Sequence, residues 1–142
     1  MQLYNVSLNT TNHGRVYKQY NLIIHNELQK KIMIDTSVIE QLKYDVGDNM
    51  AIELLNVFVN ESKKLVEQML ASTKPEEIEL CAHSLKSSGY SFGATRLAQT
   101  CQLIEQQVKV NGLDTEVTTL LKLADAQSKK TFEHMNELIQ NH

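Results

Sequence analysis

The chain lacks tryptophan and contains only one proline, five glycines and eight Phe or Tyr residues among its 142 residues. A β-sandwich or barrel needs many turns, which proline and glycine commonly form, so this composition argues against both folds. Hydrophobic residues make up 42% of the chain, which suffices for a packed core and is too many for a disordered protein. One domain is expected at this length. Good helix formers dominate its second half.

An excess of basic charge is also absent, because 14 Lys and Arg stand against 17 Asp and Glu, for a net charge of −3. Nucleic-acid binding needs a basic surface, so the composition argues against a nucleic-acid partner. No segment approaches the roughly 18 consecutive apolar residues of a membrane span. The first residues also lack the basic stretch and apolar core of a signal peptide. We expect no membrane association.

Cysteine is scarce as well, and both copies, Cys81 and Cys101, fall on apolar stripes of helical sequence. Such cysteines are usually buried free thiols, and disulfides are rare in the cytoplasm. We therefore expect two buried thiols rather than a disulfide, and a cytoplasmic protein.

Charge and amino-acid composition divide the chain into two parts. Residues 1–32 contain four basic residues and one acidic residue, a net charge of +3, so the remaining 110 residues carry −6. The first part is rich in Asn, Tyr and Thr and has a poor hydrophobic period. We interpret residues 1–32 as an extension or arm, and residues 33–142 as the folded domain.

Residues 33–142 have a helical pattern throughout. Asp35 is expected to cap a short helix over 36–46, and Asp48 a longer one over 48–72. Pro75 begins a third helix, a break at Gly93 separates it from a fourth, and Asp114 caps a fifth. Four long amphipathic helices with short connections favour an all-α fold, an antiparallel four-helix bundle whose one end is covered by the short helix.

One histidine lies on the outer face of the third predicted helix. At about 100° per residue, Cys81, Leu85 and Phe92 lie opposite His83, which therefore points into solvent. The same helix face carries Glu79, Lys86, Ser87 and Tyr90. The neighbouring residues Ser88, Gly89 and Ser91 are small, so they leave the imidazole uncovered. A large partner could reach the imidazole there.

This arrangement suits phosphoryl chemistry. Neutral imidazole is a competent nucleophile toward an activated phosphoryl group, and Lys86, one turn on, supplies positive charge. The chain has no glycine-rich phosphate loop and no acidic cluster for Mg²⁺, so we expect no autonomous kinase activity. The phosphoryl donor would have to bring its own catalytic groups.

The surrounding motif resembles the signature of histidine-containing phosphotransfer (HPt) domains, which is about A-H-x-L-K-G and then G-A-x-x-L-x-x-x-C-x-x-L-E. The corresponding residues are Ala82-His83-Ser84-Leu85-Lys86-Ser87, followed by Gly93-Ala94, Leu97, Cys101 and Ile104-Glu105. The resemblance covers about residues 33–142. It departs at Ser87, where most members have glycine, although serine is also small.

The resemblance implies a phosphoryl carrier of bacterial two-component phosphorelays. His83 would accept the phosphoryl group from the aspartyl phosphate of one receiver domain and pass it to another, with Lys86 as electrostatic support. Ser87 would preserve access or contact the phosphoryl group. Receiver domains and a hybrid sensor histidine kinase would be the partners of a monomeric protein. No cofactor is expected on this chain, because Mg²⁺ would belong to the receiver.

The expected partner surface centres on His83, with Glu79, Leu80 and Tyr90 around it and the helix over 48–72 contributing. Two other functions remain open on the residues alone. A helical adaptor would bind receiver or kinase domains without carrying phosphate. A di-iron carboxylate bundle would need inward Glu and Glu-x-x-His pairs on several helices, which the sequence does not supply, and no spacing supports zinc.

Overall fold

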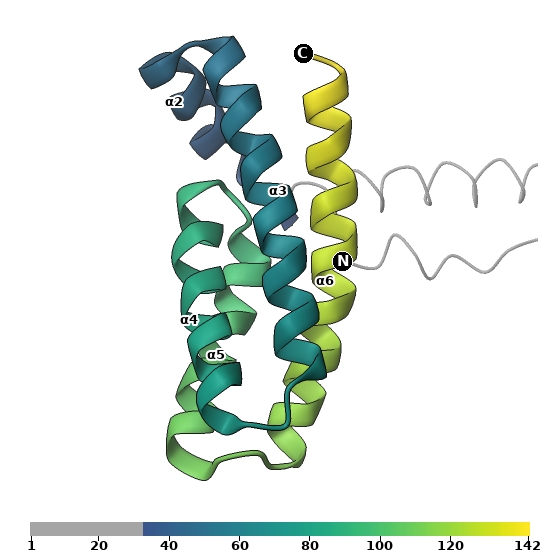
Figure 1. Cartoon of the computed structure of the whole chain (residues 1–142). Coiled ribbons are helices and arrows are strands. Elements are labelled where there is room, and N and C mark those ends of the chain that lie inside the picture. Colours follow the sequence, from purple (N-terminus) through teal and green to yellow (C-terminus); the bar gives the residue numbers. More distant parts are fainter. Residues whose placement is uncertain (1–32) are drawn as a thin grey trace, which may run out of the picture.

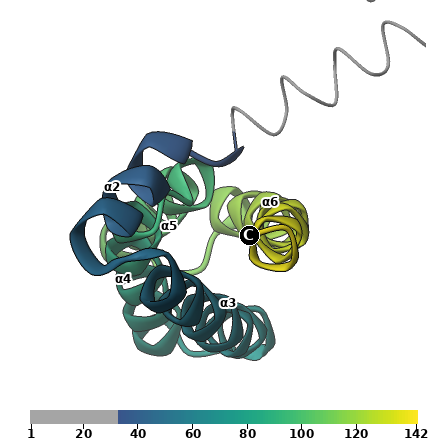
Figure 2. The same cartoon turned by 90° about the horizontal axis from the view of Figure 1, so that it is seen from above.

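The computed structural model describes residues 33–142, which form helices and no β-strand. In chain order the helices are α2 (Thr36–Val46), α3 (Asp48–Ala71), α4 (Pro75–Ser91), α5 (Thr95–Asn111) and α6 (Thr115–Gln140). Helices α3 to α6 run alternately up and down (Figure 1). Each of these four packs against two others, so that they enclose one core (Figure 2). The predicted all-α, antiparallel four-helix bundle is confirmed.

The predictions for residues 1–32 lie outside the described residues, and the boundary at residue 32 stays a prediction. None of the helices within 33–142 combines the length and hydrophobicity that crossing a membrane requires.

The bundle core is built from the inner faces of the four long helices. Burying one large aliphatic side chain contributes about 1.5–3 kcal/mol, so this core provides most of the stability. Cys81 and Cys101 are buried free thiols, as predicted. Burial raises the pKa of the Cys101 thiol to about 12. The largest fully buried apolar side chains are Leu55, Met69, Ile78, Leu85, Leu97, Ile104 and Met135.

Two of the three predicted aspartate caps are confirmed. The Asp35 carboxylate accepts a hydrogen bond from the Ser37 N–H at 3.0 Å, and the Asp114 carboxylate accepts one from the Val117 N–H at 2.9 Å. The prediction for Asp48 was wrong, because Asp48 is already the first residue of α3. A single residue, Gly47, ends α2 and begins α3, which leaves no position for a separate side-chain cap.

The short helix α2 is fixed to the end of the bundle at the α4–α5 connection. The Asp35 N–H donates to the Gly93 carbonyl at 2.8 Å. Gly93 has a φ of +82°, and a Cβ there would lie 2.7 Å from the Asp35 carbonyl oxygen. Only glycine fits this contact, since other residues are strained at positive φ and would also clash. The contact at Gly93 thus attaches the predicted cover to the bundle, and Figure 1 shows α2 at that end of the molecule.

We predict that Gly93→Ala lowers the free energy of unfolding by about 2–4 kcal/mol, because it adds a steric clash to the cost of positive φ. Gly47→Ala is a matched control, since Gly47 has a φ of +88° but open space around it. The control should lose only the backbone component, about 1–3 kcal/mol, because its φ of +88° and ψ of 159° are favourable for glycine alone. Urea unfolding of both variants measures the difference, and equal losses would contradict a specific contact at Gly93.

Candidate functional site

His83 points outward from α4 because the opposite face of this helix packs into the core. Cys81, Ala82 and Leu85 are almost completely buried, whereas the His83 side chain is 59% exposed. The predicted orientation of His83 is therefore confirmed.

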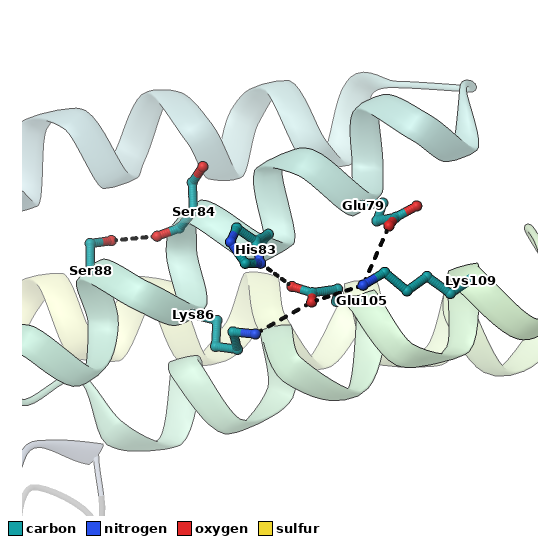
Figure 3. A network of polar contacts seen from close by, with 7 residues as sticks. All are labelled: Glu79, His83, Ser84, Lys86, Ser88, Glu105 and Lys109. Atoms are coloured by element: carbon teal, nitrogen blue, oxygen red, sulfur yellow. Dashed lines mark hydrogen bonds and ion pairs between the residues drawn. The ribbon is translucent and has the colours of Figure 1, made fainter.

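The close approach of α4 and α5 determines what lies beside this histidine. A Cβ on Gly89 of α4 would lie 3.0 Å from the Ala98 Cβ of α5 and 3.3 Å from the Ala94 carbonyl oxygen. Two small residues thus let the antiparallel backbones come together. Six residues earlier on α4 and seven later on α5, the same register brings His83 next to Glu105 (Figure 3).

Glu105 is the centre of a polar network between the two helices (Figure 3). Its side chain is only 8% exposed, and its Oε2 lies 2.8 Å from the Nδ1 of His83. Its Oε1 accepts hydrogen bonds from the Nζ atoms of Lys86 at 3.3 Å and Lys109 at 3.4 Å. Lys109 also lies 3.7 Å from a carboxylate oxygen of Glu79 on α4. A buried carboxylate is costly unless it is paired in this way.

The hydrogen bond to Glu105 fixes which ring nitrogen of His83 carries the proton. An ionised carboxylate can only accept, so the Nδ1 of His83 must carry the proton. In the neutral imidazole, the lone pair then resides on Nε2. Figure 3 shows this second nitrogen on the side of the ring away from Glu105. The geometry therefore leaves Nε2 accessible, with a lone pair that could act as a nucleophile.

The same contacts keep Glu105 ionised. Burial raises the pKa of its carboxyl, but the hydrogen bonds from His83, Lys86 and Lys109 together outweigh burial and lower the pKa below its ordinary value of 4.5. At neutral pH the carboxylate is thus charged and able to hold the Nδ1 proton.

The structure places the other predicted site residues as follows. Lys86 is mostly buried, 25% exposed, and pairs with Glu105. Ser87 is exposed one turn after His83, and its carbonyl accepts a hydrogen bond from the Ser91 hydroxyl at 3.1 Å. The Ser88 hydroxyl bonds to the Ser84 carbonyl of its own helix at 2.9 Å. Lys86 therefore contacts the same carboxylate as the imidazole, while the Ser88 hydroxyl is bonded to the α4 backbone.

The predicted partner residues lie on both sides of His83 along α4. Leu80 is 67% exposed, and with Glu79 and His83 it lines an open hollow of about 330 Å³ between α4 and α5. Tyr90 is 42% exposed, and its hydroxyl donates to the Gln102 side chain of α5 at 3.1 Å. Both are accessible, and their contact with a partner stays a prediction.

No role is predicted from the sequence for Glu105 or Lys109, although Glu105 is the last residue of the recognised motif. A signal was present, since Glu105 borders the apolar row of Leu97, Cys101 and Ile104, where a charged residue needs a partner. That partner lies 22 residues away, so only the packing of α5 on α4 identifies it. The helix that completes the site is α5, and a contribution from α3 stays a prediction.

No group of three or more His, Cys, Asp or Glu side chains within residues 33–142 has a metal-binding arrangement.

The Hpt-domain family model matches residues 53–141, more than half of the chain, so the chain belongs to the Hpt-domain family. The phosphorelay protein LuxU of Vibrio harveyi is 28% identical over 87 residues, which cover 59% of this chain and 76% of LuxU. The signal transduction histidine-protein kinase BarA of Shigella flexneri is 38% identical over 88 residues. These cover 58% of this chain but only 9% of BarA.

The fold is also that of a solved member. The crystal structure of histidine-containing phosphotransfer protein B (HptB) from Pseudomonas aeruginosa PAO1 matches with a TM-score of 0.72 at 19% sequence identity. The match covers 78% of this chain and 96% of HptB. Family membership and the phosphorelay relative confirm the predicted function: the chain is a histidine phosphotransfer protein of phosphorelays.

We predict that Glu105→Gln makes stability less dependent on pH. Because the pKa of Glu105 is lowered on folding, its ionisation stabilises the fold above the unfolded pKa of about 4.5. This contribution is lost as the pH falls through the lower folded value. At pH 7 the variant should lose about 1–3 kcal/mol, and the gap to wild type should close below pH 4.5.

Chemical denaturation at a series of pH values measures this gap. Glu53→Gln is the control, since Glu53 is an exposed carboxylate on α3. A gap for Glu105→Gln that stays constant down to pH 2 would show that the lost stability does not come from ionisation.

Proposed function

We propose that His83 accepts a phosphoryl group from the aspartyl phosphate of one receiver domain and passes it to another in a multistep phosphorelay. The observation that carries this assignment is the 2.8 Å contact between Nδ1 of an exposed histidine and a buried carboxylate. The contact leaves Nε2 as the outward-facing nucleophile.

In the transfer step, the Nε2 lone pair of His83 forms the new N–P bond. The P–O bond to the receiver's aspartate breaks, and its electron pair remains on that carboxylate. The Nδ1 proton stays on the imidazole, so the phosphorylated ring carries a positive charge that the Glu105 carboxylate offsets. Transfer to the second receiver runs through the same step in reverse.

Lys86 and Ser87 support the phosphoryl group from the next turn of α4. The Lys86 ammonium and the His83 ring contact the same Glu105 carboxylate, so the ammonium is near enough to the ring to pair with a phosphoryl oxygen there. Ser87 leaves space next to the ring, and its hydroxyl can donate to the same group.

We infer that this protein depends on its partners for the rest of the chemistry. The sequence has no phosphate-binding loop, so kinase activity belongs to a hybrid sensor histidine kinase, and Mg²⁺ belongs to the receiver domains. The carrier itself then needs no cofactor. We propose that it acts in the cytoplasm as a monomer, and that its contacts with receivers are transient.

The His83 assignment predicts that a phosphorylated receiver domain labels the wild-type protein and not His83→Gln. The label should be acid-labile and base-stable, as expected for phosphohistidine. His142→Gln is the matched control, because it removes an exposed histidine at the end of the chain. Label on neither wild type nor variant would favour a non-catalytic adaptor, and equal label on both would place the acceptor elsewhere.

We also propose that receivers dock on the α4 face around Leu80, with Glu79 and Tyr90 at its margins. An apolar side chain that is 67% exposed beside the reactive ring suits such a contact.

Leu80→Ala should weaken binding to a cognate receiver about fivefold, which corresponds to about 1 kcal/mol, and leave the thermal midpoint nearly unchanged. Leu123→Ala is the control, because Leu123 is an exposed leucine on α6. Titration calorimetry with the receiver measures both, and an equal effect of the two variants would remove Leu80 from the docking surface.

A further inference from the structure

Lys109 takes part in the His83 network although it comes from α5 and lies outside the recognised motif. Its Nζ lies 3.4 Å from Glu105 Oε1 and 3.7 Å from Glu79 Oε1, so it joins a buried carboxylate to one on the neighbouring helix. Figure 3 shows that Lys86 and Lys109 approach Glu105 from opposite sides.

The two carboxylate oxygens of Glu105 are used differently. Oε2 accepts from His83, whereas Oε1 is shared by the ammonium groups of Lys86 at 3.3 Å and Lys109 at 3.4 Å. If Lys86 turns toward a phosphoryl group, Oε1 loses one of its two cations. Before the N–P bond forms the His83 ring is still neutral, so without a second cation a carboxylate that is 8% exposed would be poorly compensated at that stage.

We propose that Lys109 is a positioning residue, which holds Glu105 against His83 Nδ1 while Lys86 moves between Glu105 and the phosphoryl group. This inference rests on the proposed phosphoryl transfer at His83. Lys109 acts through Glu105 and does not contact the transferred group. Its pairing with Glu79 keeps its ammonium on the far side of the carboxylate from Lys86.

Two properties of Lys109 suit it to this role. It lies one helical turn after Glu105 on the same helix, so its distance to the carboxylate does not depend on movement of α4. Its side chain is 55% exposed, so the ammonium remains hydrated and removing it leaves no buried charge of its own. Removing the Lys109 charge should therefore act mainly on the position of Glu105 and, through Glu105, on His83.

The test compares wild type with Lys109→Met, which keeps much of the aliphatic stem and removes the charge. The full-length proteins are phosphorylated with phosphoramidate, a small donor that needs no docking, and also with a phosphorylated receiver domain. Lys129→Met is the matched control, because the Nζ of Lys129 lies 3.4 Å from the carboxylate four residues before it, Asp125, on α6.

We expect Lys109→Met to be phosphorylated about tenfold more slowly with both donors, the loss that corresponds to one charge-assisted hydrogen bond. Lys109→Arg should restore most of the rate, and Lys129→Met should match wild type. A slower rate with the receiver alone would instead make Lys109 a docking residue and overturn the positioning role.

Nitrogen-15 NMR of the His83 ring gives a readout that a structural role would not change. In the unphosphorylated protein, Lys86 still compensates Glu105, so Lys109→Met should largely keep the proton on Nδ1. In the double variant with Lys86→Met, the ring should shift toward the Nε2–H tautomer. After phosphorylation, the Nδ1 proton of Lys109→Met should exchange with water faster than that of wild type.

Two outcomes separate this inference from the proposed function. If wild type accepts no phosphoryl group, the transfer function fails and the role of Lys109 fails with it. If wild type is phosphorylated and Lys109→Met matches it in rate and in Nδ1 proton exchange, only the positioning role is overturned. Thermal unfolding of each variant checks that the bundle is intact.

Discussion

The hydrogen bond between Glu105 on α5 and His83 on α4 is the interaction on which the rest of the site depends. It joins a carboxylate that is 8% exposed to an imidazole that is 59% exposed, across 2.8 Å. The buried partner supplies a fixed position and a negative charge, while the exposed partner keeps one nitrogen available. The contact thus orients a surface side chain, as the proposed role of His83 as a nucleophile requires.

Packing makes this contact possible. Gly89 and Ala98 let α4 and α5 approach closely, and the apolar residues beneath His83 prevent α4 from rotating. Gly93, at the turn between the two helices, also anchors α2 to the end of the bundle. The rigid fold therefore supplies the precision, and the chemistry needs only a few polar side chains at its surface.

Charge balance in the site concerns the phosphorylated protein as much as the free one. At the proposed acceptor His83, phosphorylation would add about 1.5–2 negative charges. Lys86 already lies there, paired with Glu105, and Lys109 provides a second cation on the same carboxylate. A carrier must accept and release its cargo with similar ease. Side chains that exchange partners without leaving a buried charge unpaired suit this requirement.

The sequence by itself determined the helices, the caps at Asp35 and Asp114, the outward face of His83 and the family motif. These features follow from the 3.6-residue period and from local capping chemistry, which act over a few residues. The cap predicted at Asp48 was wrong, because Gly47 alone separates α2 from α3 and Asp48 is already the first residue of α3. The partnership of His83 with Glu105 and Lys109 was decided by the tertiary structure alone. Glu105 and Lys109 follow His83 by 22 and 26 residues in the sequence, and they come close to it only because α5 packs against α4. The local sequence pattern does not determine how the two helices align.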